Sequence, residues 1–416
     1  MVDLERAYAS VSARNARAYR SLGTLAAADF DAGLVIGANT LPRSAAATGL
    51  RKLAEAGLLL STGEHPVRGP LYELGPVARK HARRLSRSCG EMDRPLEQLA
   101  TWLVTNSSAV NELVTPDHAR LRHSCTRAHH RLLFATPHDA LQWLESQHRN
   151  CMTVLRAAAE EGMHEFVWQL VHAMWPAWRQ YRRYSDWILA HELAVRAADA
   201  CKESAASLVL ATTLGIALRS TGRYEEALAL LTEVLNQARQ DSDQRMAAQA
   251  LHEIGSTHLA CGRLTAARRA LNEARALHMK AGAWLGAALT GITYARIDLV
   301  QGQPAVAARR LVRAMDQLTR AGDSYNAARA RAYLSRACSL AGDTESARHH
   351  ARLAHAFFRA GAPHLWSARS LEYLGLTEQD AGNPEAARVL LGKACTEYGP
   401  ISRADAERLQ HHPVMA

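Results

Sequence analysis

The sequence predicts an all-α protein whose C-terminal half is a superhelical α-solenoid, a stack of similar helix pairs. The first observation is a glycine that returns five times at a constant interval of 40 residues, from position 222 to position 382. The second is a composition that is 48% hydrophobic but only 6% aromatic, and rich in alanine and arginine. Alanine and arginine favour helices over strands on intrinsic propensity. Together they predict helical repeats with a small β contribution at most.

Small residues at fixed places define each repeat. The turn glycines are Gly222, Gly262, Gly302, Gly342 and Gly382. An alanine follows every turn glycine after five residues, and the residue seven positions before each turn is small as well: Gly215, Gly255, Ala295, Ser335 and Gly375. Glycine ends a helix by adopting a conformation that other residues resist, and small side chains let two helix backbones approach closely. The pattern therefore predicts two helices that cross closely beside a turn.

Large apolar residues occupy the places between the small ones. They are Leu214, Ile254, Tyr294, Leu334 and Leu374 in the first helix of each pair, and Leu231, Leu271 and Leu311 in the second helix. One pair alone leaves an apolar face uncovered, whereas stacking neighbouring pairs covers that face. We therefore expect the pairs to stack into a continuous superhelix.

These positions resemble the tetratricopeptide repeat, and Gly215, Gly222, Ala227 and Val234 match its spacing in the first unit. The family's repeat has 34 residues. The interval of 40 here predicts longer helices or longer loops, the loops being DSDQ, AGAW, AGDS and GAPH. Arg182 stands 40 residues before Gly222, and its segment RRYSDW is similar to GRYEEA, which predicts a degenerate sixth repeat. The solenoid is expected to span residues 161–410.

The first 90 residues predict a winged helix-turn-helix domain. They read as helix, helix, turn and helix, followed by a short hairpin and a basic helix. The third helix, from about Pro42 to Ala56, is the one that would enter a DNA groove. Turn-forming glycines and prolines mark LLLSTGEHPVRGPLYEL as the hairpin, or wing. Residues 91–160 are expected to form a helical connector.

The connector resembles the segment that joins a winged helix to tetratricopeptide repeats in actinobacterial AfsR-type regulators of the NB-ARC signal-transduction class. Trp143, Leu144 and Asn150 keep the family's pattern, whereas Gln147 stands in place of the usual Glu and Cys151 in place of Leu. The resemblance implies a transcription-associated or signalling regulator. The family's ATPase module is missing, because G-x-x-x-x-G-K-[ST] occurs nowhere in the sequence. We therefore expect the C-terminal half of such a regulator, encoded as a separate protein.

No enzyme signature is present, so we expect no catalysis, no metal and no cofactor. The histidine clusters, His129–His130 and His349–His350 with His355, lack the H-E-x-x-H spacing, and no G-x-S-x-G elbow occurs. The seven cysteines never form CxxC, which favours reduced thiols. The N-terminus lacks a signal peptide's apolar core, and no run approaches the roughly 18 apolar residues of a membrane span. A cytoplasmic protein without a membrane partner is expected.

A net charge of +10, with a pI near 9.5, predicts an acidic partner such as a nucleic acid or an acidic peptide. Basic side chains at the inward-facing positions of the first helices would line one groove. They are Arg219, His252, Arg296, Arg329, Arg336 and Arg369. Such a groove would hold a protein or acidic peptide by pairing arginine with carboxylates.

The N-terminal domain offers a second candidate surface, for double-stranded DNA. Arg43, Arg51 and Lys52 on the expected third helix, and Arg68 in the wing, are candidates for phosphate contacts. The basic residues of the following helix, from Arg79 to Arg87, could add to them. The alternative is a pure scaffold or adaptor in which the winged helix only packs as a cap. The sequence predicts neither the identity of the partner nor the oligomeric state.

Overall fold

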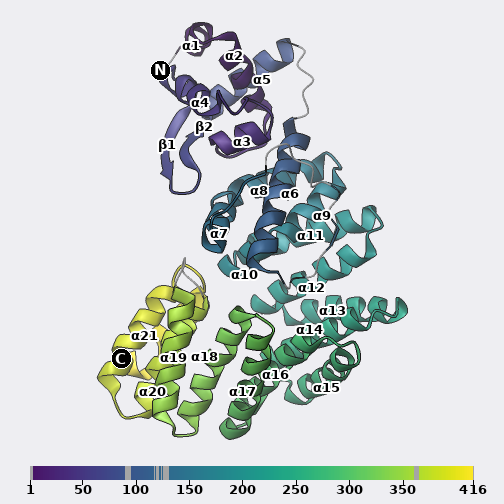
Figure 1. Cartoon of the computed structure of the whole chain (residues 1–416), viewed down its shortest axis with the longest axis vertical. Helices are drawn as coiled ribbons and strands as arrows, with labels where there is room; N and C mark the ends of the chain where they lie inside the picture. Colours follow the sequence, from purple (N-terminus) through teal and green to yellow (C-terminus); the bar gives the residue numbers. More distant parts are fainter. Residues whose placement is uncertain are drawn as a thin grey trace. The chain divides into compact units, whose positions relative to one another are not determined.

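The computed structural model describes residues 3–89, 95–116, 118, 121–122, 124, 131–359 and 365–415 (Figure 1). The described residues form 22 α-helices, one 3-10 helix and one two-stranded antiparallel sheet, so the all-α prediction is confirmed. The chain forms two compact units, Met1–Arg179 with Leu189–Leu210 and Gln180–Ile188 with Ala211–Ala416. Among the described residues, no helix combines the length and apolarity needed to cross a membrane.

The first unit begins with a small module of helices and one hairpin, residues 3–89, which we call the N-terminal module. Its elements are α1 (Leu4–Ser10), α2 (Ala13–Thr24), α3 (Ala32–Gly37), α4 (Ala46–Glu55), β1 (Leu60–His65), β2 (Gly69–Glu73) and α5 (Pro76–Ser88). The hairpin is antiparallel, and Phe30 extends it through a bridge to Tyr72. The order from α2 to α5 agrees with the expected order of helices and hairpin, and α1 is additional.

Side chains at helix starts explain why the module's helices begin where they do. The hydroxyl oxygen of Ser12 accepts from the backbone N–H of Asn15 at the start of α2, and the carboxylate of Asp31 accepts from Leu34 at the start of α3. Such caps satisfy N–H groups that the helix itself leaves without a partner.

The rest of the first unit is helical. Its helices are α6 (Pro95–Val114), α7 (Pro137–Ser146), α8 (His148–Glu160), α9 (His164–Ala173) and α10 (Trp175–Tyr181), and parts of α11 (Tyr184–Ala200) and α12 (Ser204–Ser220) belong to it. The indole of Trp102 on α6 is fully buried and packs edge-to-face on Trp143, with ring centroids 5.6 Å apart. Trp168 and Trp178 are buried too, so these aromatic side chains are core residues.

The second unit repeats one helix pair with little variation. After α12 come α13 (Tyr224–Gln240), α14 (Gln244–Ala260), α15 (Leu264–Lys280), α16 (Trp284–Val300), α17 (Pro304–Arg320), α18 (Ser324–Leu340), α19 (Thr344–Arg359), α20 (Leu365–Asp380) and α21 (Pro384–Tyr398). The C-terminus adds α22 (Arg403–Gln410) and a 3-10 turn (Pro413–Met415). Most of the paired helices are 17 residues long. The additional residues of the 40-residue repeat therefore lie in the helices; the loop GAPH lies outside the described residues.

Backbone conformation at the turns confirms the role expected of the glycines. All five turn glycines have positive φ, between 69° and 84°, a region that side chains with a Cβ disfavour. Arg182 stands at the equivalent place one repeat earlier and has φ of 51°. The backbone at Arg182 thus shares the positive φ of the turn glycines, and the degenerate sixth repeat stays a prediction.

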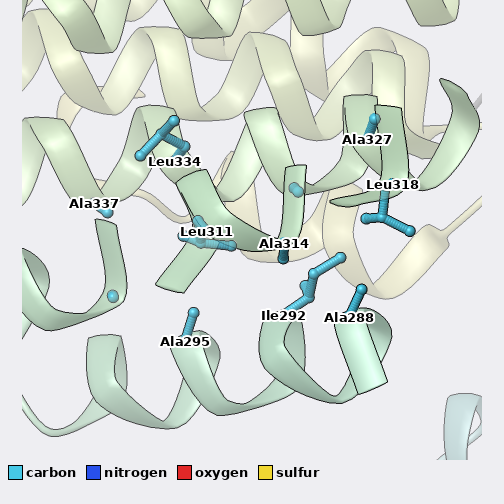
Figure 2. Packing of buried hydrophobic residues seen from close by; sticks show 11 residues of the cluster. Ala288, Ile292, Ala295, Leu311, Ala314, Leu318, Ala327, Leu334 and Ala337 are labelled. Carbon is cyan, nitrogen blue, oxygen red and sulfur yellow. The ribbon is translucent and has the colours of Figure 1, made fainter. Parts of the chain in front are cut away.

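The small residues before each turn allow close helix contact. A Cβ added to Gly215 would lie 2.8 Å from the side chain of Leu231, and the same holds within a few tenths of an ångström for Gly255 against Leu271. Both leucines are fully buried. Figure 2 shows the corresponding core one repeat further along, where Leu311 of α17 lies between residues of α16 and α18. An apolar cluster of this kind therefore joins three successive helices of the stack.

The first helices of the pairs lie on the inner side of the curve. Successive first helices contact each other, α14 with α16, α16 with α18 and α18 with α20. The described second helices, such as α15 and α17, make fewer contacts with each other. A stack whose members approach more closely on one side curves toward that side. On α14, α16, α18 and α20, the side chains that point away from the core therefore face the concave surface. We call this surface the inner face.

Candidate functional site

All six basic residues expected in the groove lie on first helices of the pairs. Arg219 is on α12, His252 on α14, Arg296 on α16, Arg329 and Arg336 on α18, and Arg369 on α20, and each side chain is half-buried. They differ in what each one contacts, and the difference follows their place along the stack.

The first two basic residues are engaged with neighbours in the solenoid. Arg219 forms an ion pair with the buried carboxylate of Glu253. Burial raises the pKa of Glu253, but the charge and hydrogen bond of Arg219, together with the neighbouring His252 and Arg329, lower that pKa overall. His252 is 3.1 Å from the hydroxyl of Thr290, and burial lowers its pKa to about 4. At neutral pH, His252 is therefore uncharged.

The last two basic residues are neutralised by carboxylates. Arg336 donates to Asp380 at 2.6 Å, and Arg369 donates to Asp405 of α22 at 3.0 Å. Arg369 also lies 3.4 Å from Glu372, which is only 5% exposed. Burial lowers the pKa of Arg369, but its tyrosine and carboxylate neighbours more than compensate and raise it well above its ordinary value. These arginines hold the C-terminal end of the stack together.

The two arginines in the middle have aromatic rings as neighbours in place of carboxylates. The guanidinium carbon of Arg296 lies 5.6 Å from the ring centre of Tyr333, and that of Arg329 lies 5.0 Å from the ring centre of Trp366. Tyr333 and Trp366 pack edge-to-face with centroids 5.2 Å apart. Among the described residues, no carboxylate lies within 4.0 Å of either guanidinium. We call Arg296, Arg329, Tyr333 and Trp366 the arginine–aromatic cluster.

The environment of Arg329 opposes its charge. Burial lowers the pKa of Arg329; Tyr325 and Tyr333 oppose this, but the positive charges of Arg182 and Arg296 add to it, and the pKa is lowered overall. One N–H donates to the amide oxygen of Asn326 at 2.6 Å, while the buried Nε–H of Arg329 has no acceptor among the described atoms. A guanidinium presents five N–H donors in a fixed fork. The cluster therefore holds donor capacity that the described residues leave unused.

Sequence reasoning identified the arginines of this cluster but missed the aromatic residues. Tyr333 and Trp366 were not among the residues that the sequence singled out. A comparison across repeats does separate the arginines, because Ala332 and Leu340 stand where the next repeat has Glu372 and Asp380.

The residues expected to contact DNA do not share one environment. Arg51 and Lys52 are exposed on α4, and Arg43 is exposed in the turn before it. Arg51 also forms an exposed ion pair with Glu55, one helical turn along, at 2.5 Å. Arg43, Arg51 and Lys52 therefore remain candidates for phosphate contacts.

Arg68 lies elsewhere than the sequence led us to expect. Its side chain is 1% exposed, and it forms ion pairs with Asp29 and Asp31. Its third donor, Nη1, reaches the backbone oxygen of Ser146 at the end of α7, at 2.9 Å. The two aspartates are distant in sequence, so the hairpin alone did not reveal them. Every branch of the guanidinium is engaged inside the protein, and we withdraw Arg68 from the DNA-contact set.

Asn150, which keeps the family's pattern, and Gln147, which departs from it, complete the same buried network. Asn150 accepts from the backbone N–H of Ala28 at 2.8 Å and donates to Asp29 at 3.0 Å. Gln147 donates to Asp31 at 3.2 Å and accepts from Asn150 at 2.8 Å. An amide at position 147 adds a donor to a site that already holds two carboxylates, whereas a Glu there would add a third negative charge. The network joins the N-terminal module to α8.

The basic helix α5 serves mainly to hold its own module. Arg79 donates to the backbone oxygens of Leu25 and Ala27 at 3.0 and 2.9 Å, and Arg83 donates to that of Gly23 at 2.8 Å. These arginines satisfy carbonyl groups around the end of α2, so part of the basic run is structural.

The second helices carry one further concave feature. An open depression of about 570 Å³ lies between α13 and α15, on the second helices, where Arg239 and Glu273 pair with each other at 2.5 Å. Its charged lining is thus partly neutralised. No group of three or more histidines, cysteines and carboxylates at metal-binding distances occurs among the described residues, and His129–His130 lie outside them.

Comparison with known proteins identifies the repeat. The tetratricopeptide repeat family model matches residues 185–280, and the helix pairs continue with the same 40-residue interval to α21. No curated protein sequence matches the chain.

Among solved structures, the chain is similar to kinesin light chain repeats of Podosopora anserina, with 18% identity over 47% of this chain and 95% of that chain, at a TM-score of 0.37. It is also similar to a signal transduction ATPase with a tetratricopeptide repeat sensor from Pyrococcus horikoshii: 13% identity, 97% and 66% coverage, TM-score 0.41. RapI in its apo form gives 12% identity, 64% and 98% coverage, and a TM-score of 0.47.

Proposed function

We propose that this chain of tetratricopeptide repeats is a non-enzymatic regulatory protein that captures a protein or peptide partner on the inner face of its solenoid. The observation that carries the proposal is the row of half-buried basic side chains on the first helices, which face the concave side. A curved stack presents an extended inner surface of fixed shape, which suits recognition of a chain segment. The positive net charge favours an acidic partner. A cytoplasmic setting fits the described cysteines, all of which are unpaired.

The partner-binding proposal is tested with a tagged full-length chain, using co-purification from the native cell extract followed by mass spectrometry. Charge reversal at Arg219→Glu and Arg296→Glu should abolish capture of the partner that the wild-type chain retains. The matched control is Arg309→Glu with Arg313→Glu, two exposed arginines on the second helix α17. Equal capture by both double variants would exclude the inner face as the binding site.

A second role, contact with DNA through the N-terminal module, is favoured by the exposed Arg43, Arg51 and Lys52 on and before α4. The alternative, in which the module is only a packing cap, is favoured by the buried network around Arg68. An electrophoretic mobility shift with genomic fragments separates the two roles. Salt-sensitive binding that is lost in Arg51→Ala with Lys52→Ala supports DNA contact, because each phosphate contact releases counterions. No shift at low salt leaves the packing role.

A further inference from the structure

The solenoid contains an internal comparison, because its inner-face arginines recur one repeat apart. Arg336 lies 40 residues after Arg296 and pairs with Asp380 at the end of α20. The residue that corresponds to Asp380 one repeat earlier is Leu340, at the end of α18. Two arginines in equivalent positions thus differ in whether the next repeat supplies a carboxylate.

The second pair differs in the same way. Arg369 lies 40 residues after Arg329, and its carboxylate neighbours are Glu372 and Asp405. The residue that corresponds to Glu372 one repeat earlier is Ala332. The residue that corresponds to Asp405 is Leu365, so neither carboxylate has a counterpart beside Arg329.

Aromatic rings hold the two unpaired guanidiniums in place. A guanidinium over an aromatic face is attracted by the ring's electrons but keeps its N–H edges available. The edge-to-face contact between Tyr333 and Trp366 fixes both rings, and Tyr333 also packs on the buried Tyr373 at 6.1 Å. Arg296 and Arg329 are therefore oriented before any ligand arrives.

A half-buried cationic cluster of this kind carries an electrostatic cost. Placing guanidinium groups near each other in a partly desolvated environment disfavours their charge unless an anion compensates it. The described residues supply rings and one amide oxygen, but no negative charge within ion-pair distance. In the next repeat, carboxylates compensate the positive charge of the arginines at the equivalent positions.

We infer that the arginine–aromatic cluster is a binding site for a carboxylate group of an acidic peptide, which takes the place that Glu372, Asp405 and Asp380 take in the next repeat. The inference rests on the proposed function and deepens it, because it names the chemical group of the partner and the two arginines that receive it. Carboxylate and guanidinium form two parallel hydrogen bonds, which gives direction as well as charge compensation.

The experiment measures binding of carboxylate-bearing peptides, labelled with an uncharged dye, to the full-length chain by fluorescence anisotropy at low salt. The probes are a pentaglutamate with an amidated C-terminus, a pentaalanine with a free C-terminus, and a pentaglutamine amide as neutral control. The first two separate side-chain carboxylates from a terminal carboxylate. Wild-type chain should bind at least one of them and not the pentaglutamine.

The test variant is Arg296→Gln with Arg329→Gln, and the control is Arg309→Gln with Arg313→Gln, which removes the same charge from α17. We expect the test variant to bind the acidic peptide at least about tenfold more weakly, the size of losing charge-assisted hydrogen bonds. The control should stay within about twofold of wild type, because long-range attraction alone is similar in both variants. Thermal melting confirms that both variants are folded.

Equal weakening in both double variants would overturn the inference, because it would show that the net charge alone attracts the peptide. Unchanged binding in the test variant, or no binding of either acidic peptide by wild type, would overturn it as well. The outcome is separable from that of the proposed function. Loss of peptide binding in the test variant supports the carboxylate site even when no cellular partner is captured, and capture that survives in the Arg219→Glu, Arg296→Glu variant contradicts only the proposed function.

Discussion

The middle and the C-terminal end of the inner face carry arginines at the same repeat positions, yet their surroundings differ. At the end of the stack, Arg336 and Arg369 are bound to carboxylates that also tie neighbouring helices together. In the middle, Arg296 and Arg329 rest on aromatic rings without such a partner. The repeat fixes where a side chain lies, and its neighbours decide whether its charge stabilises the fold or remains available for a ligand.

The physical reason is the balance between desolvation and pairing. A buried ion pair offsets the cost of taking charge out of water only when both partners are present. Removing one partner from such a pair leaves the other uncompensated, which is strongly destabilising. Removing a partly buried charge that has no partner removes its desolvation cost and should not lower the free energy of unfolding. Substitutions at equivalent positions should therefore have different effects on stability at the two places.

The largest effect on stability is expected at the C-terminal end. Arg369→Leu removes one of the two arginines that Glu372 and Asp405 share and leaves Arg408 as their remaining partner, so the free energy of unfolding should fall by about 2–3 kcal/mol. Urea denaturation followed by circular dichroism measures it. The control is Arg403→Leu, which breaks an exposed pair with Glu407 and should cost less than about 0.5 kcal/mol. Equal stability of Arg369→Leu and wild type would contradict the structural role of Arg369.

A change of pH should have an intermediate effect on stability. The buried histidines and the C-terminal end of the inner face should respond in different pH ranges. Burial holds the pKa of His252, on α14 before the middle of the inner face, at about 4, below its ordinary value of 6.5. The unfolded chain therefore binds this proton first, so stability is lost as pH falls from 6.5 toward 4, by about 1–2 kcal/mol. Burial also lowers the pKa of His278 and His350, which adds to the same loss.

The C-terminal end should respond only at lower pH. Burial raises the pKa of Asp405, but Arg369 and the hydrogen bond from Ser402 lower it below the ordinary 3.8. Its contribution is present above that value and is lost as pH falls through the lowered pKa. Melting temperatures between pH 7 and pH 2 measure both ranges. His252→Gln should reduce the first loss and Asp405→Asn the second; a reduction of the same loss by both variants would contradict the separation.

The smallest effect is expected at Arg329, the counterpart of Arg369. Arg329→Leu should leave the free energy of unfolding unchanged or raise it by up to about 1 kcal/mol, because it removes a charge without a carboxylate partner. The measurement is the same urea denaturation, in the absence of any acidic peptide. A loss as large as that of Arg369→Leu would break the comparison between the two places and show that Arg329 has a structural role.

The solenoid could be predicted from the sequence because its rules are local and repeated. Gly222 and its counterparts mark turns that require positive φ, and Gly215 marks a close contact that Leu231 completes. A pattern that returns five times identifies both without knowledge of distant contacts. The predicted superhelix of helix pairs is therefore confirmed.

The environment of individual arginines could not be predicted in the same way. Arg68 was placed in an exposed wing because its hairpin was recognised, but Asp29 and Asp31 precede it by more than 35 residues and come together with it only in the fold. Asn150 lies 121 residues from Asp29 in the same network. Such contacts depend on tertiary packing. On the inner face, by contrast, comparing Ala332 with Glu372 across the repeat would have indicated which arginine lacks a carboxylate.

The constant interval between turn glycines also means that the length of the solenoid can change by whole helix pairs. Joining Gly262 directly to Gln303 would remove 40 residues and still place a turn glycine between a first and a second helix, with every small and large residue in register. The stack would be shorter by one pair while each remaining junction kept its shape. Gene duplication or deletion at these boundaries can thus lengthen or shorten the solenoid by whole repeats. The packing of the remaining helix pairs would not change.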